Sequence, residues 1–149
     1  MDATLPPART PSGFTEVAAW AVTTTDDLTH VRDALYTMLP GSGTRRLGEI
    51  PESIVLVTSE LTTNALRHGR APALVRLHQS RGAYMIEVVD HAPESAPVVA
   101  GPRAAGEGGF GLVLASRLAQ DVGWYSTRTA KHVWAVLAAD DRSRLTTAS

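Results

Sequence analysis

The chain lacks several features that are typical of particular classes of protein. It has no cysteine, which excludes disulfide bonds, thiol catalysis and a cysteine-ligated zinc site and suits a reducing compartment. Its formal net charge of −1 gives no electrostatic footprint for nucleic acid or an anionic membrane. No apolar run approaches the roughly 20 residues that span a bilayer, and residues 1–13 lack the apolar core of a signal peptide. We therefore expect a soluble, cytoplasmic protein without direct contact to nucleic acid or membrane.

What is present indicates one small domain of the α+β class. At 149 residues and 44% hydrophobic, the chain can bury one adequate core and no second one. The proline-containing residues 1–13 are predicted to be a mobile tail, residues 14–140 the folded domain, and residues 141–149 a C-terminal tail. Periodicity and turn signals predict strands over residues 14–22, 73–78, 83–90, 122–127 and 132–138, and helices over residues 26–39, 51–68 and 109–120.

The second predicted helix carries a carboxylate and a carboxamide four residues apart. Glu60 and Asn64 lie within about 40° of each other on this helix. Both offer oxygen ligands or proton acceptors of the kind that handle Mg²⁺ and a reacting hydroxyl or water in phosphoryl transfer. The pair borders the apolar face of Leu61 and Ala65, as residues in the wall of a ligand cavity would. A solvated polar pair is the alternative, because such a short motif often occurs by chance.

Two further motifs follow along the chain. Residues 84–90 alternate between apolar and other side chains and read as a strand that ends at Asp90. Residues 106–111 read G-E-G-G-F-G and run into a predicted helix. Glycines let backbone N–H groups approach a ligand closely, and a helix start favours phosphate. By itself such a loop is also typical of a flexible connection, so the order of the three motifs is the specific signal.

That order is E-L-x-x-N-A-x-x-H-G, then a strand ending in Asp, then G-x-G-L opening a helix. It closely resembles the ATPase superfamily of Hsp90, DNA gyrase, histidine kinases and MutL. Within this superfamily the chain is most similar to the small anti-sigma-factor serine kinases of Gram-positive bacteria and their stand-alone relatives in actinobacteria. The resemblance covers roughly residues 15–138. K-H-V-W at residues 131–134 resembles the last strand of this group, which often reads G-x-x-V-W, with Lys131 or Ala130 where the glycine is expected. It implies an α/β two-layer sandwich whose mixed, largely antiparallel sheet carries helices on one face.

The resemblance also implies roles for individual residues. Asn64 would coordinate Mg²⁺ between the phosphates of ATP, Asp90 would bind the exocyclic amino group of adenine, and Glu60 would be the catalytic base toward a hydroxyl or water. His68 continues the polar stripe and could approach the phosphates, although a helix C-terminus favours a cation without any ligand. The remaining nucleotide-binding positions that the resemblance implies are Ala92, Gly106, Gly108, Gly109, Gly111 and Leu112.

One motif departs from the family pattern. The first glycine box, typically D-x-G-x-G, here reads D-H-A-P-E over residues 90–94. Ala92 stands at one glycine position, and the neighbouring Pro93 fixes φ and removes a backbone donor. The loop on the adenine side must therefore differ in shape from that of the family.

Two functions from different classes follow. The first is an ATP-dependent serine kinase that phosphorylates a STAS-type anti-sigma-factor antagonist and binds a sigma factor, with a homodimer formed through the N-terminal strand and first helix as in the kinases it resembles. The second is a non-catalytic partner-switching module, with or without nucleotide. Glu60 and Asn64 favour the first, and the altered loop after Asp90 favours the second. The catalytic part of a histidine kinase and a gyrase- or MutL-like ATPase fit less well, because no phosphoacceptor hairpin or transducer domain is visible.

Overall fold

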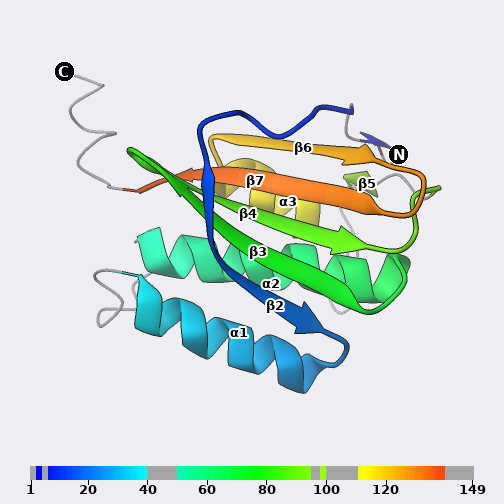
Figure 1. Cartoon of the computed structure of the whole chain (residues 1–149), viewed down its shortest axis with the longest axis horizontal. Coiled ribbons are helices and arrows are strands. Elements are labelled where there is room, and N and C mark those ends of the chain that lie inside the picture. Colours follow the sequence, from blue (N-terminus) through cyan, green and yellow to red (C-terminus); the bar gives the residue numbers. More distant parts are fainter. Residues whose placement is uncertain (1–2, 5–6, 40–49, 95–97, 100–110, 140–149) are drawn as a thin grey trace.

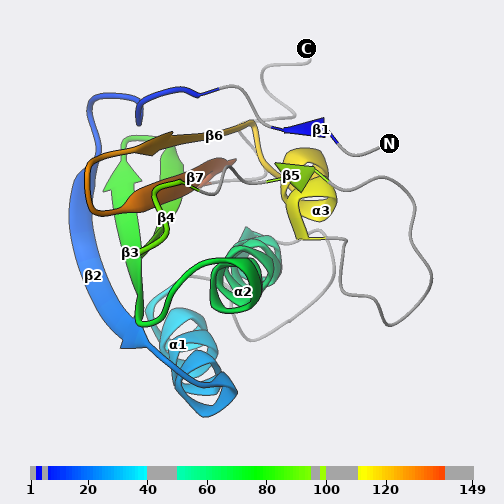
Figure 2. The same ribbon diagram turned by 90° about the vertical axis from the view of Figure 1, so that its right-hand side faces the viewer.

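Five strands form one antiparallel sheet, and three helices of the described chain cover one of its faces (Figure 1, Figure 2). The computed structural model describes residues 3–4, 7–39, 50–94, 98–99 and 111–139. In spatial order the strands are β2 (Thr15–Val22), β3 (Ala73–Ser80), β4 (Ala83–Asp90), β7 (Lys131–Ala138) and β6 (Asp121–Ser126). The helices are α1 (Thr25–Met38), α2 (Ile50–His68) and α3 (Gly111–Leu118). The predicted α/β two-layer sandwich is confirmed, and every pairing among these five strands is antiparallel.

Local sequence explains where α1 begins. Thr24 is the N-cap, and its hydroxyl accepts a hydrogen bond from the backbone N–H of Asp27 at 3.3 Å. The carboxylate of Asp27 accepts hydrogen bonds in return from the backbone N–H groups of Thr23 and Thr24. This capping box satisfies donors that a helix start leaves without partners. The same hydrogen bonds, first that of Thr23 and then that of Thr24, hold the pKa of Asp27 below its usual value.

The long helix α2 is the centre of the helical layer. It contacts α1 on one side and α3 on the other, and it packs on β3, β4 and β7 (Figure 2). Its buried side chains include Ile54, Val57, Leu61 and Ala65, which join the main core between the sheet and the helices. The helix ends at His68, as the break at residues 69–72 predicts. None of the helices that the structure describes is long and apolar enough to cross a membrane.

The strands β3 and β4 form the predicted hairpin. Ser80 pairs with Ala83, and Gly82 in the turn has a φ of 87°, a left-handed value that glycine adopts without strain. Along β4, Ile86 and Val88 face the helices and the main core, whereas Met85 and Glu87 face the opposite side of the sheet. The pattern of period two predicts this alternation.

The face of the sheet away from the helices carries a second, smaller apolar cluster. Met85, Trp134 and Val136 are buried there, with Phe14 and Tyr125 packed against them. This face is therefore covered in part by residues near the N-terminus, which run across it before β2 begins (Figure 1).

The N-terminal segment makes contacts that its composition does not indicate. Residues 1–13 were expected to be mobile, yet β1 (Ala3–Thr4) pairs with β5 (Val98–Val99), and Pro7 forms a parallel bridge with Trp124. The backbone N–H of Ala8 donates to the carbonyl of Trp124 at 2.6 Å. The physical reason is that β6 is an edge strand, whose unpaired backbone groups a neighbouring segment can bond. The predicted tail over residues 141–149 lies outside the described residues.

Gly123 allows the indole of Trp134 to lie against β6. A Cβ added at Gly123 would lie 2.3 Å from Cζ2 and 2.7 Å from Cε2 of Trp134, and the indole N–H is fixed by a hydrogen bond to the carbonyl of Ala8 at 2.8 Å. We expect Gly123→Ala to lower the free energy of unfolding by about 1–3 kcal/mol, as overpacking does. Urea unfolding measures this, with the exposed Ser126→Ala on the same strand as a control that changes by about 0.5 kcal/mol or less. Equal stabilities of the two variants would contradict the packing argument.

Candidate functional site

Glu60 and Asn64 lie on α2, within about 40° of each other around the helix axis. Both side chains are partly exposed. At about 100° per residue, Glu52 lies about 180° from Leu61 and about 80° from Glu60, on the side of the helix away from the buried face. Tyr36 of α1 donates a hydrogen bond to the carboxylate of Glu52. The helix that carries Glu60 and Asn64 contacts α3 (Figure 2).

At the end of β4, Asp90 is buried beneath the end of α2. Its side chain is 1% exposed, and its Oδ1 accepts a hydrogen bond from the backbone N–H of Ala92 at 2.8 Å. Its Oδ2 is buried and accepts no hydrogen bond. A Cβ on Gly69 would lie 2.4 Å from both Cγ and Oδ2 of Asp90, so only glycine fits after His68 here. The predicted H-G motif thus has a steric reason, which is the close approach of α2 to this carboxylate.

A lysine that the sequence did not single out for the site lies next to Asp90. Lys131 begins β7 and is the register partner of Asp90 across the β4–β7 ladder, so both side chains point to the helical face. The Nζ of Lys131 lies 3.3 Å from Oδ2 of Asp90, and the lysine side chain is 3% exposed. In the sequence, Lys131 is notable only as one of two residues, with Ala130, at the position of an expected glycine. The signal that finds it is strand register, which the sequence alone does not provide.

The altered glycine box is tied to the segment that follows α2. The backbone N–H of His91 donates to the carbonyl of Arg70 at 3.1 Å, and the guanidinium of Arg70 lies 2.8 Å from the carboxylate of Glu94. Ala92 is 3% exposed, between these contacts and Asp90. The exposed ion pair contributes about 1 kcal/mol or less. The loop therefore keeps a defined shape without the glycines of the family pattern.

Some of the remaining predicted site residues lie in described elements, and the others do not. Gly111 and Leu112 begin α3, which contacts α2, β6 and β7. His68 is the exposed last residue of α2. Gly106, Gly108 and Gly109 lie outside the described residues, so their predicted contact with a nucleotide stays a prediction.

Asp90, Asn64 and Glu60 follow one another along the axis of α2. Gly69, which touches Asp90, is five residues after Asn64 and nine after Glu60, or about 8 Å and about 14 Å along the helix axis. A buried carboxylate whose Oδ2 accepts no hydrogen bond, although it is paired with Lys131, suits a nucleobase amino group at one end. The side-chain oxygen of Asn64 suits a Mg²⁺ ion held mainly by phosphates and water, because Mg²⁺ needs few protein ligands. The residues present therefore fit both a purine nucleotide and its metal.

A comparison with models of protein families identifies the family of this chain. The sequence model described as the histidine kinase-like ATPase domain matches residues 17–137. The chain belongs to this family. ATP is the nucleotide that the family assignment implies, and Glu60, Asn64 and Asp90 all lie within the matched range.

Comparison with solved structures supports the fold of this ATPase-family domain. The chain is similar to the crystal structure of the RsbU and RsbW domains of Rv1364c from Mycobacterium tuberculosis, with a TM-score of 0.56 and 20% sequence identity. The similarity covers 87% of this chain and 33% of the other, so the chain spans about a third of the length of that protein. The search of curated proteins found no match.

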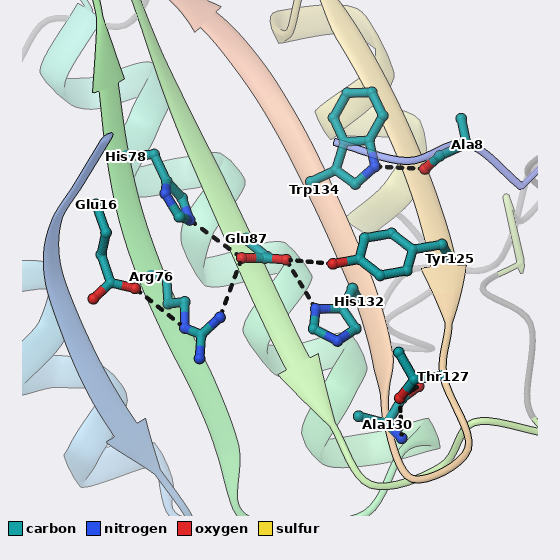
Figure 3. Close-up of polar contacts among 10 residues, drawn as sticks. All are labelled: Ala8, Glu16, Arg76, His78, Glu87, Tyr125, Thr127, Ala130, His132 and Trp134. Carbon is teal, nitrogen blue, oxygen red and sulfur yellow. Dashed lines mark hydrogen bonds and ion pairs between the residues drawn. The ribbon is translucent and has the colours of Figure 1, made fainter. Parts of the chain in front are cut away.

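The opposite face of the sheet holds a second polar cluster, centred on Glu87 (Figure 3). The Nδ1 of His132 lies 2.8 Å from one carboxylate oxygen of Glu87, and the Nε2 of His78 lies 3.2 Å from the other. The hydroxyl of Tyr125 donates to Glu87 at 3.4 Å, and a guanidinium nitrogen of Arg76 lies 3.7 Å away. Burial raises the pKa of Glu87, but the hydrogen bonds of His132 and His78 outweigh it and lower the pKa from 4.5 to about 2. No spacing in the sequence marked this cluster.

The low pKa of Glu87 makes stability depend on pH. Because the folded pKa lies below the unfolded value, the stabilisation is present above about pH 4.5 and is lost as the pH falls toward about 2. We expect Glu87→Gln to lower the free energy of unfolding by no more than about 3 kcal/mol near pH 6, with a smaller difference at acidic pH. Urea unfolding across this range measures it. Glu16→Gln is the control, because this half-exposed carboxylate pairs with the same Arg76 and contributes about 1 kcal/mol or less. A difference that stays constant with pH would contradict the linkage.

Proposed function

We propose that this ATPase-family domain is an ATP-dependent protein serine kinase that also acts as an anti-sigma factor or related switch protein. Its substrate would be a serine of a STAS-type anti-sigma-factor antagonist, and it would bind a sigma factor when that antagonist is modified. The observation that carries the proposal is the order along the axis of α2: the buried Asp90 at its end, then Asn64, then Glu60. This order follows an extended nucleoside triphosphate from base to transferred phosphoryl group.

Each residue has one task in this reaction. Asp90 accepts a hydrogen bond from the amino group of adenine. Asn64 would hold Mg²⁺, which when bound neutralises phosphate charge. Glu60 takes the proton of the attacking serine hydroxyl. The serine oxygen forms a bond to the γ-phosphorus, the bond from that phosphorus to the β–γ bridging oxygen breaks, and ADP leaves.

Two observations bear on the partners in this proposal, which are other regulatory proteins and a second copy of the chain. The similar structure contains an RsbU and an RsbW domain in one protein, which favours regulation by partner proteins as the setting for this chain. A homodimer through β2 and α1 is part of the same proposal. These two elements carry Val17 and Met38, the exposed large apolar side chains of the described residues.

A second candidate is a binding module that exchanges partners without phosphoryl transfer. The altered loop after Asp90 favours it, because Ala92 and Pro93 replace flexible backbone and Arg70 ties the loop to the end of α2. A fixed loop accommodates a nucleotide less readily than a glycine-rich one.

Phosphoryl transfer separates the two functions. The protein is incubated with labelled ATP, Mg²⁺ and STAS proteins encoded in the same genome, and ATP binding is measured by calorimetry on the same sample. Label on a serine of a STAS protein supports the kinase. ATP binding without transfer to any co-encoded STAS protein supports the binding module.

The role of Asn64 is tested by its removal. We expect Asn64→Ala to weaken Mg²⁺-dependent ATP binding, because few other protein oxygens are available to the metal. The free energy of unfolding should change by about 1 kcal/mol or less, since the side chain is partly exposed. Calorimetry with and without Mg²⁺ measures this, and Thr63→Ala, about 100° away around the helix, is the matched control. Equal Mg-ATP affinity of Asn64→Ala and the parent would remove Asn64 from the site.

A further inference from the structure

The ion pair beneath the end of α2 leaves one oxygen of Asp90 without a well-directed hydrogen bond. Oδ2 of Asp90 accepts no hydrogen bond, although Nζ of Lys131 lies 3.3 Å away. An ammonium group has three N–H donors, and Asp90 is the one partner that the described residues give it. The two side chains are 1% and 3% exposed, so water cannot readily complete their hydrogen bonds. Such a pair is costly unless further partners are supplied.

We propose that Lys131 is a second base-reading residue, which donates a hydrogen bond to N1 of adenine while Asp90 accepts one from the neighbouring amino group. The inference rests on the proposed nucleotide site and deepens it. The edge of adenine presents an N–H donor directly beside a ring-nitrogen acceptor. A carboxylate and an ammonium held side by side by the β4–β7 register present the matching acceptor and donor.

The alternative is that the base displaces Lys131 from Asp90 when it binds. Displacement would leave a buried ammonium without its counter-charge, which costs more than retaining the pair. If the Asp90–Lys131 pair is kept, Oδ2 of Asp90 and one N–H of Lys131 each gain a partner on the same edge of the base. The energetics therefore favour a lysine that stays beside Asp90 and contacts the base.

Lys131 is the only lysine in the chain, which gives the proposal a direct probe. Protein labelled with ¹⁵N at lysine Nζ yields one side-chain ammonium signal. We expect ATP to shift this signal. In 1-deaza-ATP a C–H replaces N1, so this analogue should shift the signal much less. In 7-deaza-ATP the change lies away from this edge, so it should shift the signal as ATP does.

Affinity measured by calorimetry gives the second readout. In the parent protein, 1-deaza-ATP should bind about 10- to 100-fold more weakly than ATP, the loss of a hydrogen bond to a charged group. The affinity for 7-deaza-ATP should stay within about threefold of that for ATP. In Lys131→Met the ratio between ATP and 1-deaza-ATP should approach one, with circular dichroism confirming that the variant is folded. If the variant does not fold, the three nucleotides on the parent still decide.

The outcomes separate this inference from the proposed function. A parent that binds ATP and 1-deaza-ATP equally overturns the role of Lys131 and leaves the nucleotide site standing. A folded Lys131→Met that keeps the parent's ratio assigns N1 to another donor and also overturns it. A parent that binds no ATP overturns the proposed function and this inference together.

Discussion

Glu60→Gln is expected to retain ATP binding and to lose most phosphoryl transfer to a STAS partner. A general base contributes about 10²- to 10⁴-fold to a proton-transfer step and adds little to binding of the nucleotide in the ground state. Glutamine keeps the shape of the side chain but cannot take a proton from the attacking hydroxyl. ATP affinity, partner affinity and phosphoserine formation are measured on the parent and the variant.

The control for Glu60 is a carboxylate on the same helix outside the site. Glu52→Gln removes a charge about two turns away along α2, where Tyr36 contacts it, and should leave the transfer rate close to that of the parent. Robust transfer by Glu60→Gln would contradict the base assignment. A parent without transfer, and with partner affinity indifferent to Glu60, would favour the binding module.

Asp90→Asn is expected to weaken ATP binding and to destabilise the fold. The amide presents a donor to the amino group of adenine, so binding should fall by roughly 1–3 kcal/mol. GTP carries a carbonyl at the equivalent ring position, so discrimination between ATP and GTP should shrink. The variant also leaves the buried Lys131 without a counter-charge, and breaking a buried pair costs about 3–5 kcal/mol of stability.

Two variants control for the effects of Asp90→Asn. Glu94→Gln breaks an exposed ion pair on the same loop and should change stability by about 1 kcal/mol or less. The double variant Asp90→Asn with Lys131→Met removes both buried charges and should recover most of the stability without recovering the ATP preference. Urea unfolding and calorimetry on folded protein measure the two effects. An unchanged preference for ATP over GTP in Asp90→Asn would tell against its role in reading the base.

The elements of the fold that depend on neighbours in the chain could be predicted from the sequence. The cap at Thr24, the turn at Gly82 and the end of α2 at His68 depend on contacts within a few residues. Periods of 3.6 and two residues record which side chains face the core. The helix of Glu60 and Asn64 and the strand ending at Asp90 could be placed for the same reason.

The order of the motifs along the sequence also indicated the family. The family in turn indicated the layered architecture. Separate motifs on a helix, a strand end and a helix start are individually weak, but their order is specific. The family match over residues 17–137 and the similar fold confirm these two inferences. Roles of single residues in binding and catalysis stay predictions, because they depend on contacts with a nucleotide.

Only the tertiary structure decided which distant residues share a site. Lys131 meets Asp90 because β7 pairs with β4 in one register, and a shift of one residue would turn Lys131 to the other face. Glu87 gathers partners from β3, β6 and β7 for the same reason. Local sequence determines which face a side chain takes within its own strand, but strand order and register come from packing of the whole sheet against the helices. The sequence by itself therefore determined the elements and their motifs, and tertiary packing decided the buried charge pairs on the two faces of the sheet.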